Sequence, residues 1–203
     1  MPEKEDRKLK FLTKTPIFIG VKAPKYTRRI DLVRGFEDLQ TNFLHGQYGI
    51  ISLGGGFLEW GHIEMIRNTV GKKIDTRKMV AHWRIEPPWL PRTKKGIGKR
   101  MGGGRPGINR YVYPIKADRV IIEMGGKCSF EEVLPILRVI AANLPFPAEA
   151  ISAEKLAEKR RIRVEIEAAN INPISFKYLA QNNLLGCDVW LNTSDRVYYG
   201  KCI

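Results

Sequence analysis

Apolar residues recur with helical spacing in two stretches of the chain, Glu59–Ile74 and Ser129–Leu144. In each stretch they follow one another at intervals of three and four residues, which places them on one face of a helix. Ser129 and Glu132 carry the sequence signature of a capping box at the start of the second stretch. Pro135 lacks a backbone donor and predicts a kink there. Both stretches are therefore predicted to be amphipathic helices.

Shorter stretches have the apolar content or the alternation of β-strands. They are Ile17–Val21, Gln47–Leu53, Arg77–Glu86, Tyr111–Ile115, Val120–Met124 and Glu149–Ile151. Only four residues join Tyr111–Ile115 to Val120–Met124, so these two strands are predicted to form an antiparallel hairpin. Glycines 54–56 are expected to end the strand that precedes them.

The last fifty residues carry different signals. Ala153–Ala169 is rich in helix-forming residues and is predicted to be one helix, although its second half alternates like a strand. Pro173–Leu185 predicts a short helix with Asn172 as its N-cap. Asp188–Leu191 and Arg196–Tyr199 are separated by a short polar turn and predict a closing hairpin.

Charge indicates the kind of partner. The 203 residues carry a formal net charge of +14, which favours RNA, DNA or an anionic membrane surface. Residues 1–36 have ten basic and four acidic side chains, whereas residues 153–203 have eight and six. The basic surface therefore belongs to the first three quarters of the chain. No apolar run approaches 18 residues, so no membrane span is expected.

Cysteine usage and the N-terminal sequence add weaker constraints. Cys128, Cys187 and Cys202 are widely spaced and form no C-x-x-C pair, which argues against structural zinc and disulfides and suits a reducing compartment. The N-terminal residues resemble neither a signal peptide nor a presequence, so import is left open. Residues 1–15 are expected to be poorly ordered in isolation. Lys25, Arg28, Arg29 and Arg34 lie in a segment without clear periodicity, which is expected to be a solvated arm or one that folds against RNA.

Between Arg92 and Arg110 lies a basic, glycine-rich segment with no acidic residue. Such a segment has little to bury, and its glycines disfavour a regular helix. We expect an exposed, positive loop whose backbone can approach a nucleic acid closely. His82, Trp89 and Tyr111 flank this segment and are expected either to pack in the core or to stack on unpaired bases.

Other chemistry fits the sequence poorly. A P-loop needs a serine or threonine after its Gly-Lys pair, but Arg100 follows Gly98-Lys99. The acidic residues lie at the ends of predicted elements and in no catalytic motif, so no enzymatic activity is expected. Since no DNA-reading motif is present, RNA recognised by its shape is favoured.

Several motifs, taken in order, resemble one family. The order GQYGIISL, a basic helix, HWRIEPPW, KKGIGKRMGGGRPGINRYVYPI, VIIEMGG and ANLPFPAEAI is similar to the universal large-subunit ribosomal protein of the L-sixteen family, from about Phe43 to Ser152. The most specific motifs are Arg100-Met101-Gly102 and Glu123-Met124-Gly125. The resemblance implies an α+β fold, with a mostly antiparallel sheet and two helices packed on one side. Outside the matched region, the sequence predicts an N-terminal arm and a C-terminal helical and hairpin extension.

The resemblance also implies a role. It implies binding to large-subunit rRNA and to A-site tRNA near the peptidyl transferase centre, as an architectural component with no cofactor, metal or small-molecule substrate; a free RNA chaperone or regulatory RNA-binding protein is the alternative. The candidate RNA-binding residues are Arg92, Lys94, Lys95, Lys99, Arg100, Met101, Gly102, Gly103, Gly104, Arg105 and Arg110, with Arg67, Lys72, Lys73 and Arg84. For the basic helix face, plain solvation is an equally good interpretation.

The chain departs from the bacterial pattern at both ends. We expect a basic arm over residues 1–42, an rRNA-binding core over 43–152 and a C-terminal extension over 153–203. These additions resemble the mitochondrial branch of the family, so a mitochondrial ribosome is the expected location, with a bacterial or plastid ribosome as the alternative. The near-neutral extension is expected to dock on neighbouring ribosomal proteins.

Overall fold

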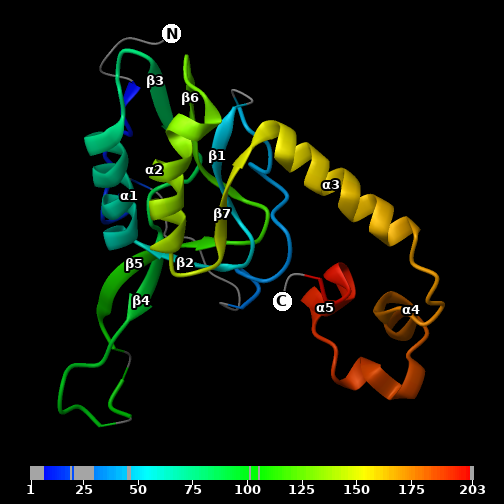
Figure 1. The fold of residues 1–203 in the computed structure, drawn as a ribbon. Coiled ribbons are helices and arrows are strands. Elements are labelled where there is room, and N and C mark those ends of the chain that lie inside the picture. The colour runs from blue at the N-terminus through cyan, green and yellow to red at the C-terminus, as the bar shows by residue number, and fades with distance from the viewer. Residues whose placement is uncertain are drawn as a thin grey trace.

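Two antiparallel sheets and two packed helices form the body of the protein (Figure 1). The computed structural model describes residues 7–18, 20, 30–44, 47–100, 102–104 and 106–201. One sheet has the strand order β3-β6-β1-β7 and the other the order β2-β5-β4. The strands are β1 (Tyr48–Ser52), β2 (Gly56–Glu59), β3 (Met79–Trp83), β4 (Leu90–Thr93), β5 (Ile108–Ile115), β6 (Val120–Gly126) and β7 (Ala148–Ser152).

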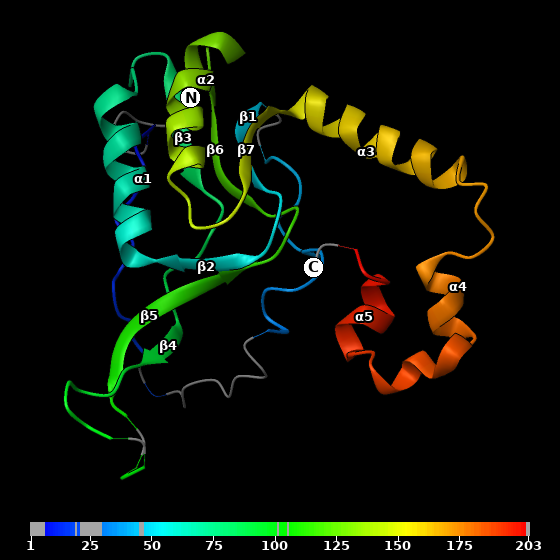
Figure 2. The ribbon, with the colours of Figure 1, turned by 60° about the horizontal axis from the view of Figure 1, so that its bottom comes forward.

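Helices α1 (Trp60–Lys73) and α2 (Phe130–Ala142) lie side by side against one face of the four-stranded sheet (Figure 2). Their apolar stripes share a core with Ile50 of β1 and Met124 of β6, all fully buried. The Ser129–Glu132 capping box is formed, with the Ser129 amide donating to the Glu132 carboxylate. The two predicted helices and the α+β class are therefore confirmed.

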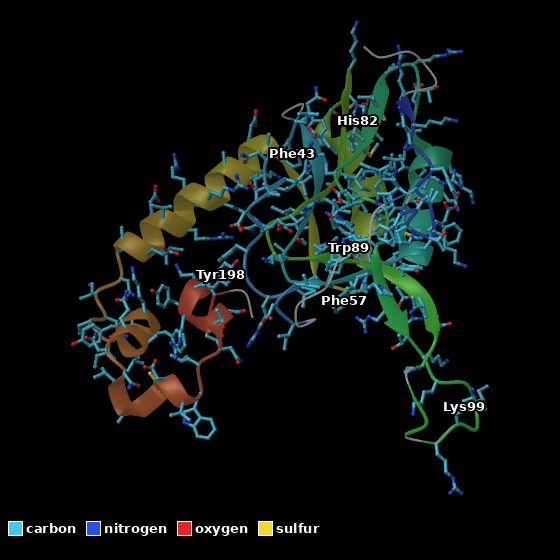
Figure 3. The ribbon with its side chains drawn as sticks, turned by 180° about the vertical axis from the view of Figure 1, so that it is seen from behind. Phe43, Phe57, His82, Trp89, Lys99 and Tyr198 are labelled. Atoms are coloured by element: carbon cyan, nitrogen blue, oxygen red, sulfur yellow. The ribbon has the colours of Figure 1, made fainter. Side chains whose placement is uncertain are left out.

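A smaller apolar cluster covers the opposite face of this sheet. Ile51 and Ile151 pack there against Leu156, with Phe43 beside them (Figure 3). The alternation of β1 produces the division, because Ile50 and Ile51 point to opposite faces of the strand. The segment before β1 and the first turns of the C-terminal extension thus complete the core.

The predicted hairpin from Tyr111 to Met124 is wrong. β5 and β6 follow each other in the chain but belong to different sheets, where β5 pairs with β2 and β4 and β6 pairs with β1 and β3. Buried Ser52 redirects the connection: its hydroxyl donates to the Lys116 carbonyl at 2.6 Å and accepts from the Arg119 amide at 3.1 Å. Asp118 adopts a φ of 63° at this turn, which carries the chain from one sheet to the other.

Strands β2 and β4 were not predicted from the sequence. Gly56 is one of the three glycines that were expected to end the preceding strand. It instead begins β2 and pairs with Ile115. β4 contains Pro91 and lies at the edge of its sheet, where a missing backbone donor is tolerated. These two strands position β5, from which the basic segment projects.

Residues 7–14 dock on the body rather than forming a free arm. The Trp83 indole N–H donates to the Lys10 carbonyl at 2.7 Å, and the Trp60 indole N–H donates to the Leu12 carbonyl at 3.3 Å. Leu9 between them is buried. Of the predicted Ile17–Val21 strand, the described residues form no strand; Ile19 and Val21 lie outside the described residues.

In the C-terminal extension, residues 153–203, the described structure is helical. It contains α3 (Ala153–Ala168), α4 (Phe176–Gln181), the 3-10 turn η2 (Leu184–Val189) and α5 (Thr193–Tyr198). The first helix is confirmed, but the cap of α4 is Ser175, not Asn172. The predicted closing hairpin is wrong, because Asn192 and Asp195 form a capping box that begins α5.

The extension leads away from the body along α3 and returns at α5 (Figures 1 and 2). Arg163 of α3 forms an ion pair with Asp118 at 2.7 Å. The Tyr198 ring lies edge-on to Phe36 with centroids 6.3 Å apart, and Gly35 leaves no room for a side chain beside Tyr198. Residues 34–42 are thereby held between the sheet and the extension.

Candidate nucleic-acid interface

Residues 94–107 form a finger that projects from the end of the β4–β5 ribbon (Figure 1). The last strand pairs at its root are Arg92 with Arg110 and Thr93 with Ile108, separated by an irregularity of register. The Lys94 amide then donates to the Gly107 carbonyl at 3.3 Å. The base of the finger is therefore fixed by backbone hydrogen bonds.

The tip of the finger is folded around one lysine. The Lys95 ammonium donates to the carbonyls of Arg100 at 3.0 Å and Gly102 at 2.7 Å. Gly102, Gly103 and Gly104 all have positive φ, between 71° and 96°, a run that side-chain-bearing residues would adopt only with strain. The glycines thus serve the conformation of the tip, and Lys95 contributes structurally to it.

Three other cations of the finger, Lys94, Lys99 and Arg100, are exposed and form no side-chain ion pair with a described residue. Figure 3 shows Lys99 extending from the finger, far from the helices and the four-stranded sheet. Ile97 is fully exposed beside it. Met101 and Arg105 lie outside the described residues.

The two cations at the root are held by the body. The Arg92 guanidinium lies over the Phe57 ring at 4.2 Å from its centroid, and Arg110 pairs with Glu59 at 3.0 Å. Both partners belong to β2, the neighbour of β5. Arg92 and Arg110 therefore brace the finger, although Arg110 remains half-exposed.

The basic residues predicted on α1 likewise include one that is held by an ion pair and two that are exposed. Arg67 binds Glu64 through two hydrogen bonds of 2.9 Å, which lower the pKa of the Glu64 carboxyl and raise that of Arg67. Lys72 and Lys73 are exposed in the last turn, where positive charge complements the helix dipole. They lie at the far end of α1 from the finger, about 20 Å along the axis from its first residue.

Arg84 and the flanking aromatic residues lie within the body. The Arg84 side chain approaches buried Glu123 at 4.0 Å and donates to the Asn42 carbonyl at 3.3 Å. Trp89 packs against the core. Figure 3 places His82 at the opposite end of the molecule from Lys99. The structure therefore does not bring these three residues together with the tip of the finger.

Sequence reasoning missed the surroundings of the finger root. Lys14, Trp60, Asn109 and Tyr111 line one hollow beside it, of about 260 Å³. Only Tyr111 was singled out from the sequence, because the approach of residues 7–14 to α1 has no local signal. Within the described residues, no group of three or more His, Cys, Asp or Glu side chains could hold a metal ion.

None of the described helices combines the length and apolar character needed to cross a membrane.

A buried polar cluster, built on Arg119, supports the turn between β5 and β6. Arg119 donates to the Tyr113 hydroxyl at 2.8 Å and pairs with Glu37 at 3.4 Å. Burial raises the pKa of Tyr113, while the positive charge of Arg119 partly opposes the shift. This cluster is structural and lies apart from the finger tip.

Comparison with known proteins identifies the family. The family model for ribosomal protein L16p/L10e matches residues 21–151. The large ribosomal subunit protein uL16 of Coprothermobacter proteolyticus is 30% identical over 132 residues, covering 64% of this chain and 96% of that protein. The uL16 proteins of Neorickettsia sennetsu and Porphyromonas gingivalis are 29% and 33% identical over 106 and 113 residues, covering 52% and 56% of this chain and 74% and 76% of theirs.

The match covers both sheets, both body helices and the finger, and leaves the whole C-terminal extension outside. The family is one of structural proteins without enzymatic activity. The chain belongs to the ribosomal protein L16p/L10e family.

Proposed function

We propose that this protein is a structural constituent of the large ribosomal subunit and binds large-subunit rRNA through the finger. The observation that carries the proposal is the contrast within residues 92–110: the root arginines are held by the body, whereas Lys94, Lys99 and Arg100 are exposed. A fixed root with a cationic tip can present charge to phosphates at a defined place. The names of the bacterial relatives support the large subunit as the site of assembly.

Electrostatics supports RNA as the partner. Each phosphate neutralised by a lysine or arginine releases counterions, so affinity falls steeply as salt is raised. The formal charge of +14 supplies such contacts, and the glycines let the backbone approach phosphates closely. Lys72 and Lys73 form a second exposed basic site, for contacts independent of the finger.

The finer assignment is also a proposal. We infer that the finger lies beside A-site tRNA near the peptidyl transferase centre, where it orders RNA and takes no part in the chemistry. The location in a mitochondrial ribosome rests on the extensions: the uL16 relative from Coprothermobacter is covered almost completely by 132 residues of this chain. Fractionation of cells carrying a tagged protein tests the compartment, and recovery outside mitochondria would contradict it.

The C-terminal extension is proposed to dock on neighbouring ribosomal proteins. From 170 to 192 it carries one basic and one acidic side chain, Lys177 and Asp188. Leu185, Val189 and Trp190 on η2 and its end are each more than four-fifths exposed. An apolar surface with few charges and no net charge, in a strongly basic protein, favours a protein neighbour over RNA.

Sedimentation through a sucrose gradient tests the ribosomal role. The tagged protein is expected to co-migrate with large subunits in high salt and to appear with free protein only after the subunits are unfolded. Migration at the top of the gradient would instead favour a free RNA chaperone or regulatory RNA-binding protein. Cross-linking of the protein to tRNA in subunits with an occupied A site tests the finer assignment.

A further inference from the structure

A hollow of about 260 Å³ lies beside the finger root, where β5 extends beyond the end of its neighbour β2. Glu59, the last residue of β2, pairs with Val112, and the chain then turns into α1 at Trp60. The first residues of β5, Ile108–Tyr111, consequently pair with β4 alone among the described strands. Their other edge faces the hollow, and its backbone donors and acceptors are open to a ligand.

Aromatic rings form two sides of the hollow. Trp60 is held in place by its hydrogen bond to the Leu12 carbonyl and by the edge of Phe11, with ring centroids 6.4 Å apart. Tyr111, half-buried on β5, lines another side. Because residues 7–14 fix Trp60, the site is built before any ligand arrives.

Polar groups leave the hollow weakly positive. Arg110 and Glu59 pair at 3.0 Å and neutralise each other. Lys14, whose ammonium lies 5.7 Å from the Trp60 ring centroid, therefore supplies the net charge. Asn109 is exposed and makes no side-chain hydrogen bond with another described residue, so its amide can both donate and accept.

We propose that this hollow holds the base of one unpaired nucleotide of the large-subunit rRNA, an inference that rests on the proposed function. Bases splayed from a helix are recognised by stacking on aromatic rings and by amide hydrogen bonds to their edges. Trp60 and Tyr111 supply the rings, and Asn109 supplies the amide. Lys14 meets the adjoining phosphate. A phosphate alone would be a poorer fit, because one net cation shares the hollow with two aromatic side chains.

Chemical probing of rRNA bases in isolated large subunits tests the site. Subunits carrying Asn109→Ala or Lys14→Ala are compared with wild type by dimethyl sulfate and carbodiimide modification. Both side chains are exposed, so neither change disturbs the core. In both variants the same unpaired nucleotide is expected to become about tenfold more reactive, since one variant loses the hydrogen bond to the base edge and the other the contact with the adjoining phosphate.

Lys177→Ala is the matched control, because the Lys177 ammonium lies 5.6 Å from the Tyr199 ring centroid in the extension, far from the finger in the chain. It is expected to leave that nucleotide unchanged. If Asn109→Ala and Lys14→Ala subunits retain the protein and show wild-type reactivity at every base, the hollow is not a nucleotide site, although the proposed function stands. Cross-linking of the hollow to a protein segment would likewise overturn it. Absence of the wild-type protein from large subunits would refute both.

Discussion

Gly49 is the second residue of β1, which lies between β6 and β7. A Cβ at this position would come within 2.4 Å of the Ile122 carbonyl oxygen and 2.5 Å of the Phe43 ring. The carbonyl belongs to a central strand and cannot move aside cheaply. At the residue scale, the close approach of Phe43 to the sheet therefore depends on the missing side chain of Gly49.

Gly49→Ala is expected to destabilise the protein by about 3 kcal/mol, the upper end of the usual cost of overpacking a core. Gly71→Ala in α1 is the matched control, because nothing lies within 4 Å of its Cβ position. Alanine there is expected to stabilise by up to about 1 kcal/mol through helix propensity. Urea denaturation followed by circular dichroism measures both, and equal effects of the two changes would contradict this account of Gly49.

Arg84→Ala separates a structural role from RNA binding. Glu123 is 1% exposed and would lose a cation 4.0 Å away, so a destabilisation of about 3 kcal/mol is expected. At temperatures where the variant is folded, its salt-dependent affinity for rRNA fragments is expected to match wild type. A lower affinity with unchanged urea stability would instead assign Arg84 to the RNA interface.

At the scale of elements, local periodicity predicted α1, α2 and most strands, because each buries one face against a continuous core. α3, which buries only Leu156, was predicted from its helix-forming residues instead. Periodicity failed where the direction of the chain after a turn depends on residues far away in the sequence. The turn at 116–119 looked like a hairpin, but its course is set by Ser52, which precedes it by more than sixty residues. In the extension, Arg196–Tyr199 was predicted to be the second strand of a hairpin, but the Asn192–Asp195 capping box begins a helix there.

The site was predictable to a similar degree. Charge and glycine content identified the basic segment. They could not distinguish the exposed basic side chains from those held by contacts with β2. The pairing of Arg92 with Phe57 and of Arg110 with Glu59 follows from the β2–β5 register, which leaves no local pattern. The hollow beside Trp60 likewise depends on residues 7–14, which were expected from the sequence to be poorly ordered in isolation.

Lys99→Ala with Arg100→Ala tests the finger as an element. Because the tip buries little and both side chains are exposed, the melting temperature is expected to stay within about 2 °C of wild type. The slope of log affinity for large-subunit rRNA against log salt is expected to fall by about 2, one unit for each phosphate that the variant no longer neutralises. Glu154→Ala with Glu158→Ala, also a double change at exposed positions, is the control for nonspecific effects of surface substitution.

At the scale of the whole molecule, the finger and η2 present different side chains. Lys94, Lys99 and Arg100 are exposed on the finger and Lys72 and Lys73 at the end of α1, whereas η2 exposes the apolar side chains of Leu185 and Val189. Among the described residues of this extension, only Leu156, near its start, enters the core. The remainder contacts residues 34–42 from outside, through Arg160, Tyr198 and Asp195. Two deletions can therefore separate its contributions to stability and to binding.

Deletion of 170–203 removes three basic and two acidic side chains, a net change of one charge from +14. Affinity for rRNA is expected to stay within about twofold of wild type, because a single exposed charge contributes little once screened. Residues 34–42 are then without Tyr198 and Asp195, so limited proteolysis is expected to cleave there faster.

Deletion of 153–203 also removes Leu156. It is expected to lower the free energy of unfolding by about 2–3 kcal/mol more than the shorter deletion, while the affinity of the folded protein for rRNA stays largely intact. A tenfold loss of affinity on removing 170–203 alone would show that this neutral region binds RNA, against the proposed protein neighbour.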